Sequence, residues 1–403
     1  MSLNDVQSSM RTHISFFGMR NAGKSSVVNA VTGQNLTIVS DKLGTTTDPV
    51  NKAMELLPLG PVVITDTPGM DDEGELGELR VQRAKRVLNK TDIAVLVVDV
   101  KKGLSGCDNE LIDIFKAKEI PYIIAYNKAD LIQNGDNADI SDEGISAENS
   151  IIVSAKSKYG INELKEKIGA VASANCAAEK LIIGDRLAEG DIVILVIPID
   201  AAAPKGRIIL PQQNVLRECL DAGAAAICVQ PQQLDETLKS LSKKPKLVIT
   251  DSQAFGDVAS VVPEDILLTS FSILLAKYKG YLDSSLKGVE AIKKLEDGST
   301  VLISEGCTHH RQCGDIGTVK IPKLLKKLSG KDLKIETSSG VEFPEELSKY
   351  SLIVHCGGCM LNEREMKFRI KCADDQDVPV INYGILFAYA NGILSRANEI
   401  FKH

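Results

Sequence analysis

The fold of the first third of the chain is decided by one stretch, Gly18-Met19-Arg20-Asn21-Ala22-Gly23-Lys24-Ser25. A strand-sized apolar run, residues 12–17, precedes it, and a helical pattern begins at Ser26. The spacing G-x-x-x-x-G-K-S between a strand and a helix is typical of a loop that binds phosphates through its backbone N–H groups. The candidate phosphate contacts are Gly18, Asn21, Ala22, Gly23, Lys24, Ser25 and Ser26.

Side chains in and after this loop complete a phosphate and metal site. The ammonium of Lys24 suits the β- and γ-phosphates, and the hydroxyl of Ser25 suits Mg²⁺. Strand 62–66 ends at Asp66, which can hold Mg²⁺ through water. The remaining candidates are Thr45 and Thr46 in a hydroxyl-rich loop, and Gly69, whose N–H can bind the γ-phosphate.

Two later loops are typical of guanine recognition. Strand 122–126 leads into Asn127, Lys128 and Asp130, and the apolar run 151–153 leads into Ser154, Ala155 and Lys156. The carboxylate of Asp130 can accept hydrogen bonds from guanine N1–H and N2–H, which adenine does not offer. The sequence therefore predicts a site for GTP or GDP with Mg²⁺.

These residues resemble the translation-factor-related GTPases and, within them, the TrmE-like group. Met70 follows Asp66-Thr67-Pro68-Gly69, and Asn21 occupies the loop position of a potassium-binding Asn in that group. The resemblance implies that K⁺, held by Asn21 and the loop 40–45, supplies charge during hydrolysis, with Thr46 on Mg²⁺. The implied catalytic residues are Lys24, Asn21, Thr46, Asp66 and Gly69. The alternative is that Asn21 only braces the loop.

The composition excludes several classes of protein. At 403 residues the chain is long enough for two or three domains. No apolar run reaches the ~18 residues of a membrane span, and the first eleven residues lack the apolar core of a signal peptide. A net charge of −7 argues against nucleic-acid binding. We expect a cytoplasmic protein with no membrane or nucleic-acid partner, and its nine cysteines to be thiols or metal ligands.

Strands and helices alternate through the rest of the chain, which predicts an α/β protein with mainly parallel sheets. We expect three domains: a GTP-binding domain over residues 1–173, a short α/β domain for dimerisation over 182–265, and a third over 266–403. Within them, one helix is expected over 383–400, and Cys219 and Cys228 are expected in the core.

Two half-motifs in the last domain indicate a soft-metal site. Cys307-Thr308-His309 follows strand 300–304, and His355-Cys356-Gly357-Gly358-Cys359 follows strand 352–355. In an open α/β sheet, ligands bind at the carboxyl ends of strands, so the three thiols are expected to converge. Zinc with three cysteines and either His309 or His355 is one interpretation. An iron–sulfur cluster is the other, and the residues alone do not separate them.

This combination, with the GTP-binding domain upstream, resembles the HydF family of FeFe-hydrogenase maturation GTPases. The resemblance implies a 4Fe-4S cluster on Cys307, Cys356 and Cys359 with a labile fourth site, for which His309 and His355 are candidates. It also implies a homodimer. As partners it implies two radical-SAM maturases that supply a diiron precursor, and an apo FeFe-hydrogenase that receives it.

Two other functions remain open at this point. The first is a ribosome- or tRNA-associated TrmE-like GTPase with a structural zinc domain, which the net charge of −7 and the lack of a basic stretch disfavour. The second is a redox protein whose Cys356 and Cys359 cycle as a disulfide, which Cys307 and the flanking histidines disfavour.

Overall fold

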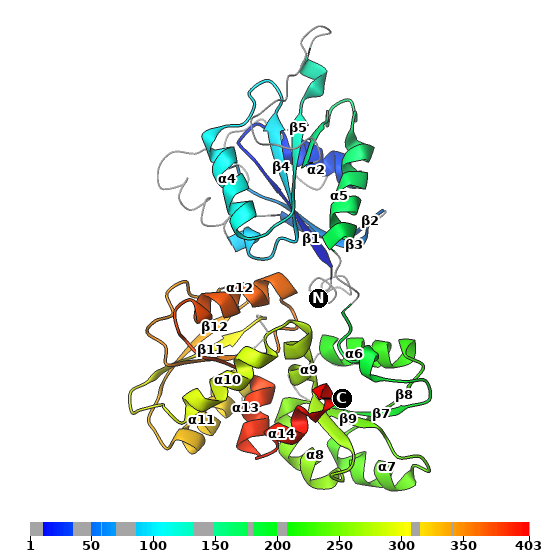
Figure 1. Ribbon diagram of the computed structural model, residues 1–403, viewed down its shortest axis with the longest axis vertical. Helices are drawn as coiled ribbons and strands as arrows, with labels where there is room; N and C mark the ends of the chain where they lie inside the picture. The colour runs from blue at the N-terminus through cyan, green and yellow to red at the C-terminus, as the bar shows by residue number, and fades with distance from the viewer. Residues whose placement is uncertain are drawn as a thin grey trace. The chain divides into compact units, whose positions relative to one another are not determined.

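The computed structural model of the chain divides into two units, Met1–Glu179 and Lys180–His403. It describes residues 11–34, 50–57, 59–69, 86–132, 149–175, 180–199, 208–307, 315–340 and 342–402. The first unit is coloured blue to green and the second green to red in Figure 1. No helix among the described residues combines the length and the apolar character that crossing a bilayer requires.

A six-stranded sheet forms the first unit, in the order β2-β3-β1-β4-β5-β6. All neighbours pair in parallel except β2 and β3, which are antiparallel. The strands are β1 (Thr12–Phe17), β2 (Val50–Leu56), β3 (Gly60–Asp66), β4 (Ile93–Asp99), β5 (Tyr122–Asn127) and β6 (Ser150–Ile152). The parallel strands end at the same edge, which places the predicted nucleotide loops together.

Helices cover both faces of this sheet (Figure 1). They are α2 (Lys24–Thr32), α4 (Gly106–Ala117) and α5 (Ile161–Asn175). Val27 of α2 and Leu164 of α5 share one buried apolar cluster with strand residues, and Phe115 of α4 belongs to a second cluster on the opposite face. The central strands are therefore buried on both sides, as their continuous apolar sequences require.

The second unit holds two four-stranded parallel sheets. One has the order β10-β9-β7-β8 and the other β12-β11-β13-β14. The strands are β7 (Ile192–Val196), β8 (Ala225–Val229), β9 (Leu247–Thr250), β10 (Leu267–Ser270), β11 (Thr300–Glu305), β12 (Lys334–Ser339), β13 (Leu352–His355) and β14 (Val380–Asn382). The expected fold class, a P-loop domain followed by two smaller α/β parts with mainly parallel sheets, is confirmed.

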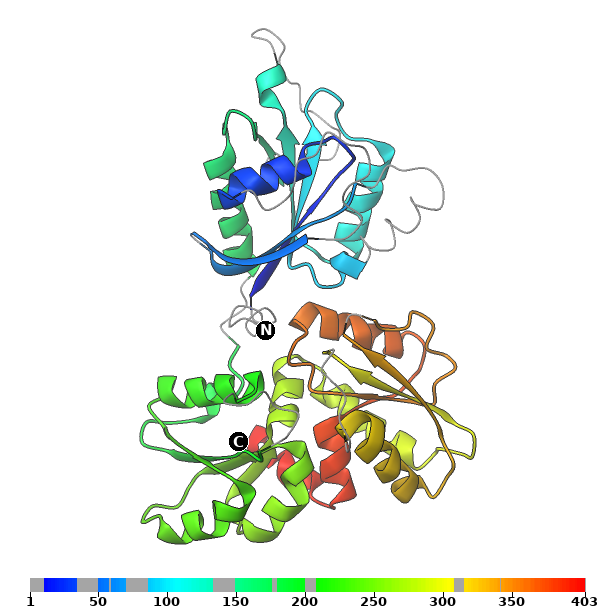
Figure 2. The ribbon, with the colours of Figure 1, turned by 180° about the vertical axis from the view of Figure 1, so that it is seen from behind.

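The helices of this unit pack on both faces of each sheet. In the β11–β14 sheet, α12 lies on one face and α10 and α11 on the other (Figures 1 and 2). One apolar core contains residues of both sheets, Val248 and Ile303 among them. The helices are α6 (Leu210–Asp221), α7 (Leu234–Ser240), α8 (Phe255–Val261), α9 (Phe271–Tyr278), α10 (Leu282–Ile292), α11 (Ile321–Ser329), α12 (Glu363–Asp374), α13 (Tyr383–Ala390) and α14 (Leu394–Ala397).

Two predictions about this unit are wrong. The single helix expected over 383–400 is divided into α13 and α14, because Gly392 adopts the left-handed backbone conformation with φ 70°. Cys219 lies in the core as expected, but Cys228 is exposed. Because β8 lies at the edge of its sheet, the face that carries Cys228 is only partly covered.

Candidate nucleotide and metal sites

The phosphate loop between β1 and α2 has a backbone that few side chains permit. Gly18 and Gly23 have φ values of 140° and 88°, and Asn21 has 62°. A Cβ on Gly18 would collide with the carbonyl oxygen of Val97, and one on Gly23 with the amide of Asn127. Glycine at both positions therefore allows the loop to lie directly against β4 and β5.

Lys24 and Ser25 face the centre of this loop. The ammonium of Lys24 donates hydrogen bonds of 2.9 Å to the carbonyl oxygens of Gly18 and Met19. The hydroxyl of Ser25 donates a 2.6 Å bond to Oδ2 of Asp66. The hydroxyl and carboxylate expected to hold Mg²⁺ are thus in contact, although they are far apart in the sequence.

The other carboxylate oxygen of Asp66 fits a bound cation. Oδ1 is buried and has no hydrogen-bond partner among the described residues. Burial raises the pKa of Asp66, while the Ser25 hydrogen bond and the Lys24 charge oppose that rise. A buried carboxylate oxygen without a donor is costly, and a hydrated Mg²⁺ ion would satisfy it.

The base side of the site is organised by Asn127. Its Nδ2 donates to the carbonyl of Ala22 at 3.0 Å, and its Oδ1 accepts from the backbone N–H of Ala155 at 3.1 Å. Ser154 donates a 2.6 Å bond to Asp130, and this bond lowers the pKa of Asp130. Asp130 is therefore kept as a carboxylate that accepts hydrogen bonds, as guanine recognition requires.

Two further predicted nucleotide residues, Lys128 and Gly69, lie in the described part of the first unit. Lys128 adopts a φ of 71° and forms a 2.7 Å ion pair with Asp99. A Cβ on Gly69 would lie 3.1 Å from Cα of Arg20, so Gly69 approaches the phosphate loop closely. Thr45, Thr46, the loop 40–49 and Met70 lie outside the described residues. For these residues the predictions stay predictions.

The cysteine half-motifs follow strand ends, as predicted, and the two strands are neighbours in the sheet. Cys356 comes directly after β13, and Cys307 comes two residues after β11, its neighbour in the sheet. The thiol of Cys356 accepts hydrogen bonds from the backbone N–H of Gly306 at 3.1 Å and of Gly358 at 3.3 Å. The residue before Cys307 therefore touches the thiol of Cys356, which brings the two half-motifs to one place.

Cys356 and Cys359 are half-buried, and the pKa of each thiol is raised above its usual value. Burial, together with the nearby Cys359, raises the pKa of Cys356 to about 11. Burial also raises the pKa of Cys359, and the positive charge of Lys279 opposes that rise. Metal binding here would have to displace protons from the thiols, and hydrogen bonds from backbone N–H groups to sulfur are suited to stabilise the resulting thiolate.

His355 has both ring nitrogens engaged within the protein. Nδ1 lies 2.7 Å from the carbonyl oxygen of Cys356, and Nε2 lies 3.3 Å from Nη1 of Arg369. Because the guanidinium can only donate, Nε2 accepts and Nδ1 carries the proton. Burial and the Arg369 charge lower the pKa of His355 to about 3, so the ring is neutral. This arrangement suits a residue that orients Cys356 rather than a metal ligand.

The metal site itself is present only as a set of suitable donors. Among the described residues, no group of three or more His, Cys, Asp or Glu side chains is arranged to hold a metal ion. The predicted candidate His309, with His310 and Cys313, lies outside those residues. Cys356 and Cys359, with the loop of Cys307 against them, fit the donor chemistry of an iron–sulfur cluster or of zinc.

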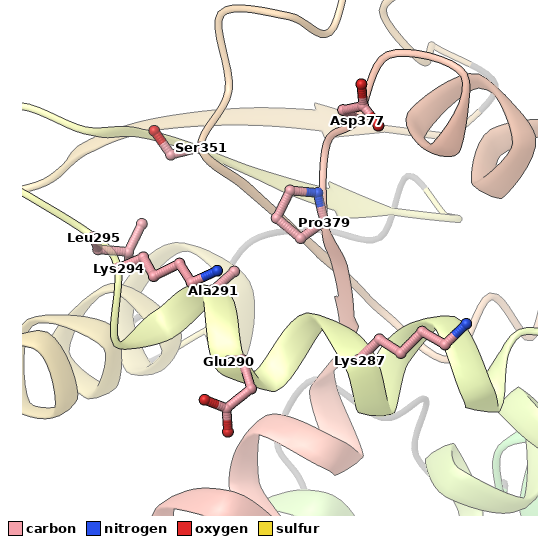
Figure 3. A pocket seen from close by; sticks show the side chains of 8 residues that line it. All are labelled: Lys287, Glu290, Ala291, Lys294, Leu295, Ser351, Asp377 and Pro379. Atoms are coloured by element: carbon pink, nitrogen blue, oxygen red, sulfur yellow. The ribbon is translucent and has the colours of Figure 1, made fainter.

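A separate cavity of about 400 Å³ lies at the opposite end of the same sheet (Figure 3). Ser351 and Pro379, which precede β13 and β14, line it together with Lys287 and Glu290 of α10. Cys356 and Cys359 follow β13, at its other end, so this cavity is not part of their site.

Sequence comparison identifies the family of the second unit. The hydrogen maturase F dimerization domain matches residues 182–280, and the hydrogen maturase F tetramerization domain matches residues 283–400. The chain belongs to the hydrogen maturase F family. The 50S ribosome-binding GTPase domain matches residues 13–128, so this hydrogen maturase F chain carries a GTPase domain before the two domains particular to its family.

Curated GTPases match a part of the hydrogen maturase F chain. It is 32% identical over 152 residues to the tRNA modification GTPase MnmE of Desulforamulus reducens, covering 38% of this chain and 32% of the relative. It is 39% identical over 129 residues to the GTPase Der of Maridesulfovibrio salexigens, covering 30% and 28%. The chain thus spans about a third of the length of these curated relatives. The solved structure of a variant of Aquifex aeolicus Era with GDP·AlF4⁻ is 19% identical, covers 57% of this chain and 98% of that one, and has a TM-score of 0.37.

Near the cysteines of this hydrogen maturase F chain, two charged residues are buried, and nothing in the sequence predicts their burial. Lys279 and Arg369 are each 1% exposed, although they occur in helical patterns where lysine and arginine usually face solvent. Only the packing of helices onto the end of the β11–β14 sheet shows that they are buried.

Proposed function

We propose that the chain is a GTP-hydrolysing scaffold for the maturation of FeFe hydrogenase. It would bind a 4Fe-4S cluster through Cys307, Cys356 and Cys359 and carry a diiron precursor to the apo-hydrogenase. The observation that carries this proposal is the contact between Gly306 and the thiol of Cys356. It joins the two half-motifs in a domain of the hydrogen maturase F family.

In the nucleotide site the residues bind and orient. The phosphate loop and Lys24 would hold the phosphates, while Ser25 and Asp66 would hold Mg²⁺, which supplies charge to the transferred phosphoryl group. Thr46 and Gly69 would contact the γ-phosphate side. Asn127, Lys128, Asp130 and the loop from Ser154 to Lys156 would hold the guanine base. Because the cluster lies in the other unit, hydrolysis would not supply the iron chemistry. It would instead regulate the binding or release of partners.

In the cysteine site the chain would supply thiolates and a shaped loop. A 4Fe-4S cluster on three cysteines leaves one iron for an exchangeable ligand. We propose that His355 orients Cys356, and that His309 remains a candidate for the fourth position. The partners would be two radical-SAM maturases and apo FeFe-hydrogenase. The domains matched over 182–280 and 283–400 support a homodimer that associates further. The proposed location of this oligomer is the cytoplasm.

The decisive experiment separates the two sites in anaerobically purified protein. Lys24→Ala removes the ammonium above the phosphate loop, and we expect GTP hydrolysis to fall about 100-fold or more. Iron content and the EPR signal of the reduced cluster should stay unchanged. Loss of the cluster in this variant would contradict separate sites. Stoichiometric zinc in place of iron would favour a TrmE-like GTPase with a structural zinc domain.

We also propose that K⁺ activates hydrolysis through Asn21. Asn21 lies in the phosphate loop with a φ of 62°, a conformation that its short polar side chain tolerates. A cation beside the β- and γ-phosphates would supply charge that an arginine finger supplies elsewhere. GTP hydrolysis should therefore be faster in KCl than in NaCl at equal ionic strength, and Asn21→Ala should remove the difference. Equal rates for the unaltered protein would rule this role out.

A further inference from the structure

Lys279, the residue after α9, directs its side chain into the interior of the second unit. Its ammonium donates hydrogen bonds to the carbonyl oxygen of Gly358 and, at 2.5 Å, to that of Leu361. These carbonyls lie on either side of Cys359, in the loop that joins β13 to α12. One buried cation therefore closes the turn that contains Cys359.

The charge of Lys279 has no carboxylate in contact. Among the described residues it forms no ion pair, and the nearby carboxylate of Glu363 is paired with Lys180 and Lys367 instead. Two carbonyl oxygens satisfy hydrogen bonds but bring no opposite charge, so burial of this ammonium is costly. Thiolates at Cys356 and Cys359, which are formed when a metal binds, would supply the missing negative charge.

The cysteine loop is held by the same segment at other points. The hydroxyl of Tyr281 donates to the carbonyl oxygen of Cys356 at 3.3 Å and accepts from Asn382 at 2.9 Å. A Cβ on Gly357 would lie 3.4 Å from Oγ of Ser272, so the loop packs directly on α9. The helix α9 and Lys279 fall within the match to the dimerization domain, whereas the cysteines fall within the tetramerization domain.

We propose that Lys279 is the positioning residue of the cysteine loop. It fixes the turn from Gly358 to Leu361 in the shape that presents Cys359, and its charge offsets that of the metal–thiolate group. The dimerization domain thereby contributes to metal binding in its neighbour. This inference rests on the proposed function, in which Cys356 and Cys359 are ligands.

The test uses the full-length chain with Lys279→Met, which keeps the length of the side chain and removes its charge and donors. Co²⁺ is titrated anaerobically into the metal-free protein, and its thiolate absorption is followed. We expect the dissociation constant for Co²⁺ to rise about tenfold, the usual scale for the loss of a group that supports ligands. In protein reconstituted with iron and sulfide, the reduction potential of the cluster should become more negative, because a nearby positive charge favours the reduced form.

Matched variants make the outcome decisive. Lys277→Met makes the same chemical change on the exposed surface of α9 and should leave both values unchanged. Lys279→Gln keeps a donor but removes the charge, and it should shift the potential in the same direction even if Lys279→Met does not fold. If both Lys279 variants had the same dissociation constant for Co²⁺ and the same reduction potential as the unaltered protein, the inference would be overturned. Equal Co²⁺ binding by the unaltered protein and Cys359→Ser would instead overturn the proposed function, and this inference with it.

Discussion

At the scale of single residues, the second unit is organised by a buried arginine. Arg369 of α12 donates to Oε1 of Glu365 at 2.9 Å, to the carbonyl oxygen of Gly340 at 2.7 Å and to His355 at 3.3 Å. Its guanidinium lies 5.0 Å from the centre of the Phe343 ring. Arginine suits this position because its planar donors point in several directions at once. The arginine therefore determines the tautomer of His355. The proton on Nδ1 of that tautomer then holds the carbonyl oxygen of Cys356 in place.

Removal of this arginine should destabilise the second unit strongly. In Arg369→Met, the buried carboxylate of Glu365 would lose its charge partner, and we expect the free energy of unfolding to fall by about 3–5 kcal/mol. Urea denaturation followed by far-UV circular dichroism measures this change. Lys367→Met is the control on the same helix, because the Lys367 side chain is exposed and its ion pair with Glu363 should contribute at most about 1 kcal/mol. Similar small losses in both variants would mean that the buried network does not stabilise the fold.

At the scale of the elements, the loops that follow parallel strands carry both sites. The glycines of the phosphate loop and of the cysteine loop are required by close approach: a Cβ on Gly358, which has a φ of 62°, would collide with Sδ of Met366. Such loops are predictable, because glycine spacing and a preceding apolar strand occur together in the sequence. Helix bounds and the burial of single side chains are less predictable. The division between α13 and α14 depends on the backbone conformation of Gly392, and the exposure of Cys228 depends on the position of β8 at the edge of its sheet.

At the scale of the whole molecule, the chain consists of two units with separate cores. The nucleotide site lies in the first unit and the cysteine site in the second. A ligand stabilises only the cooperative unit that binds it. The separation of the sites can therefore be tested without knowledge of any partner.

Differential scanning calorimetry of the full-length chain should show more than one unfolding transition. GDP with Mg²⁺, at about 100 times its dissociation constant, should raise the free energy of unfolding of the first unit by about 2.7 kcal/mol. The unfolding transitions of the second unit should not shift. Lys24→Ala, measured in parallel, should reduce this shift because it weakens phosphate binding. A uniform shift of all transitions with GDP would mean that the two units unfold together.

The sequence by itself determined the fold class and the position of the cysteines after strand ends, and it predicted the residues of the nucleotide site. It could do so because phosphate binding, guanine recognition and soft-metal ligation each require particular residue types at short, regular spacings. Only the tertiary structure decided the surroundings of those residues: the pairing of Ser25 with Asp66, the engagement of both nitrogens of His355, and the burial of Lys279 and Arg369. These contacts join residues that are distant in the chain, and burial of a charge depends on which helix packs over it, which no local pattern records.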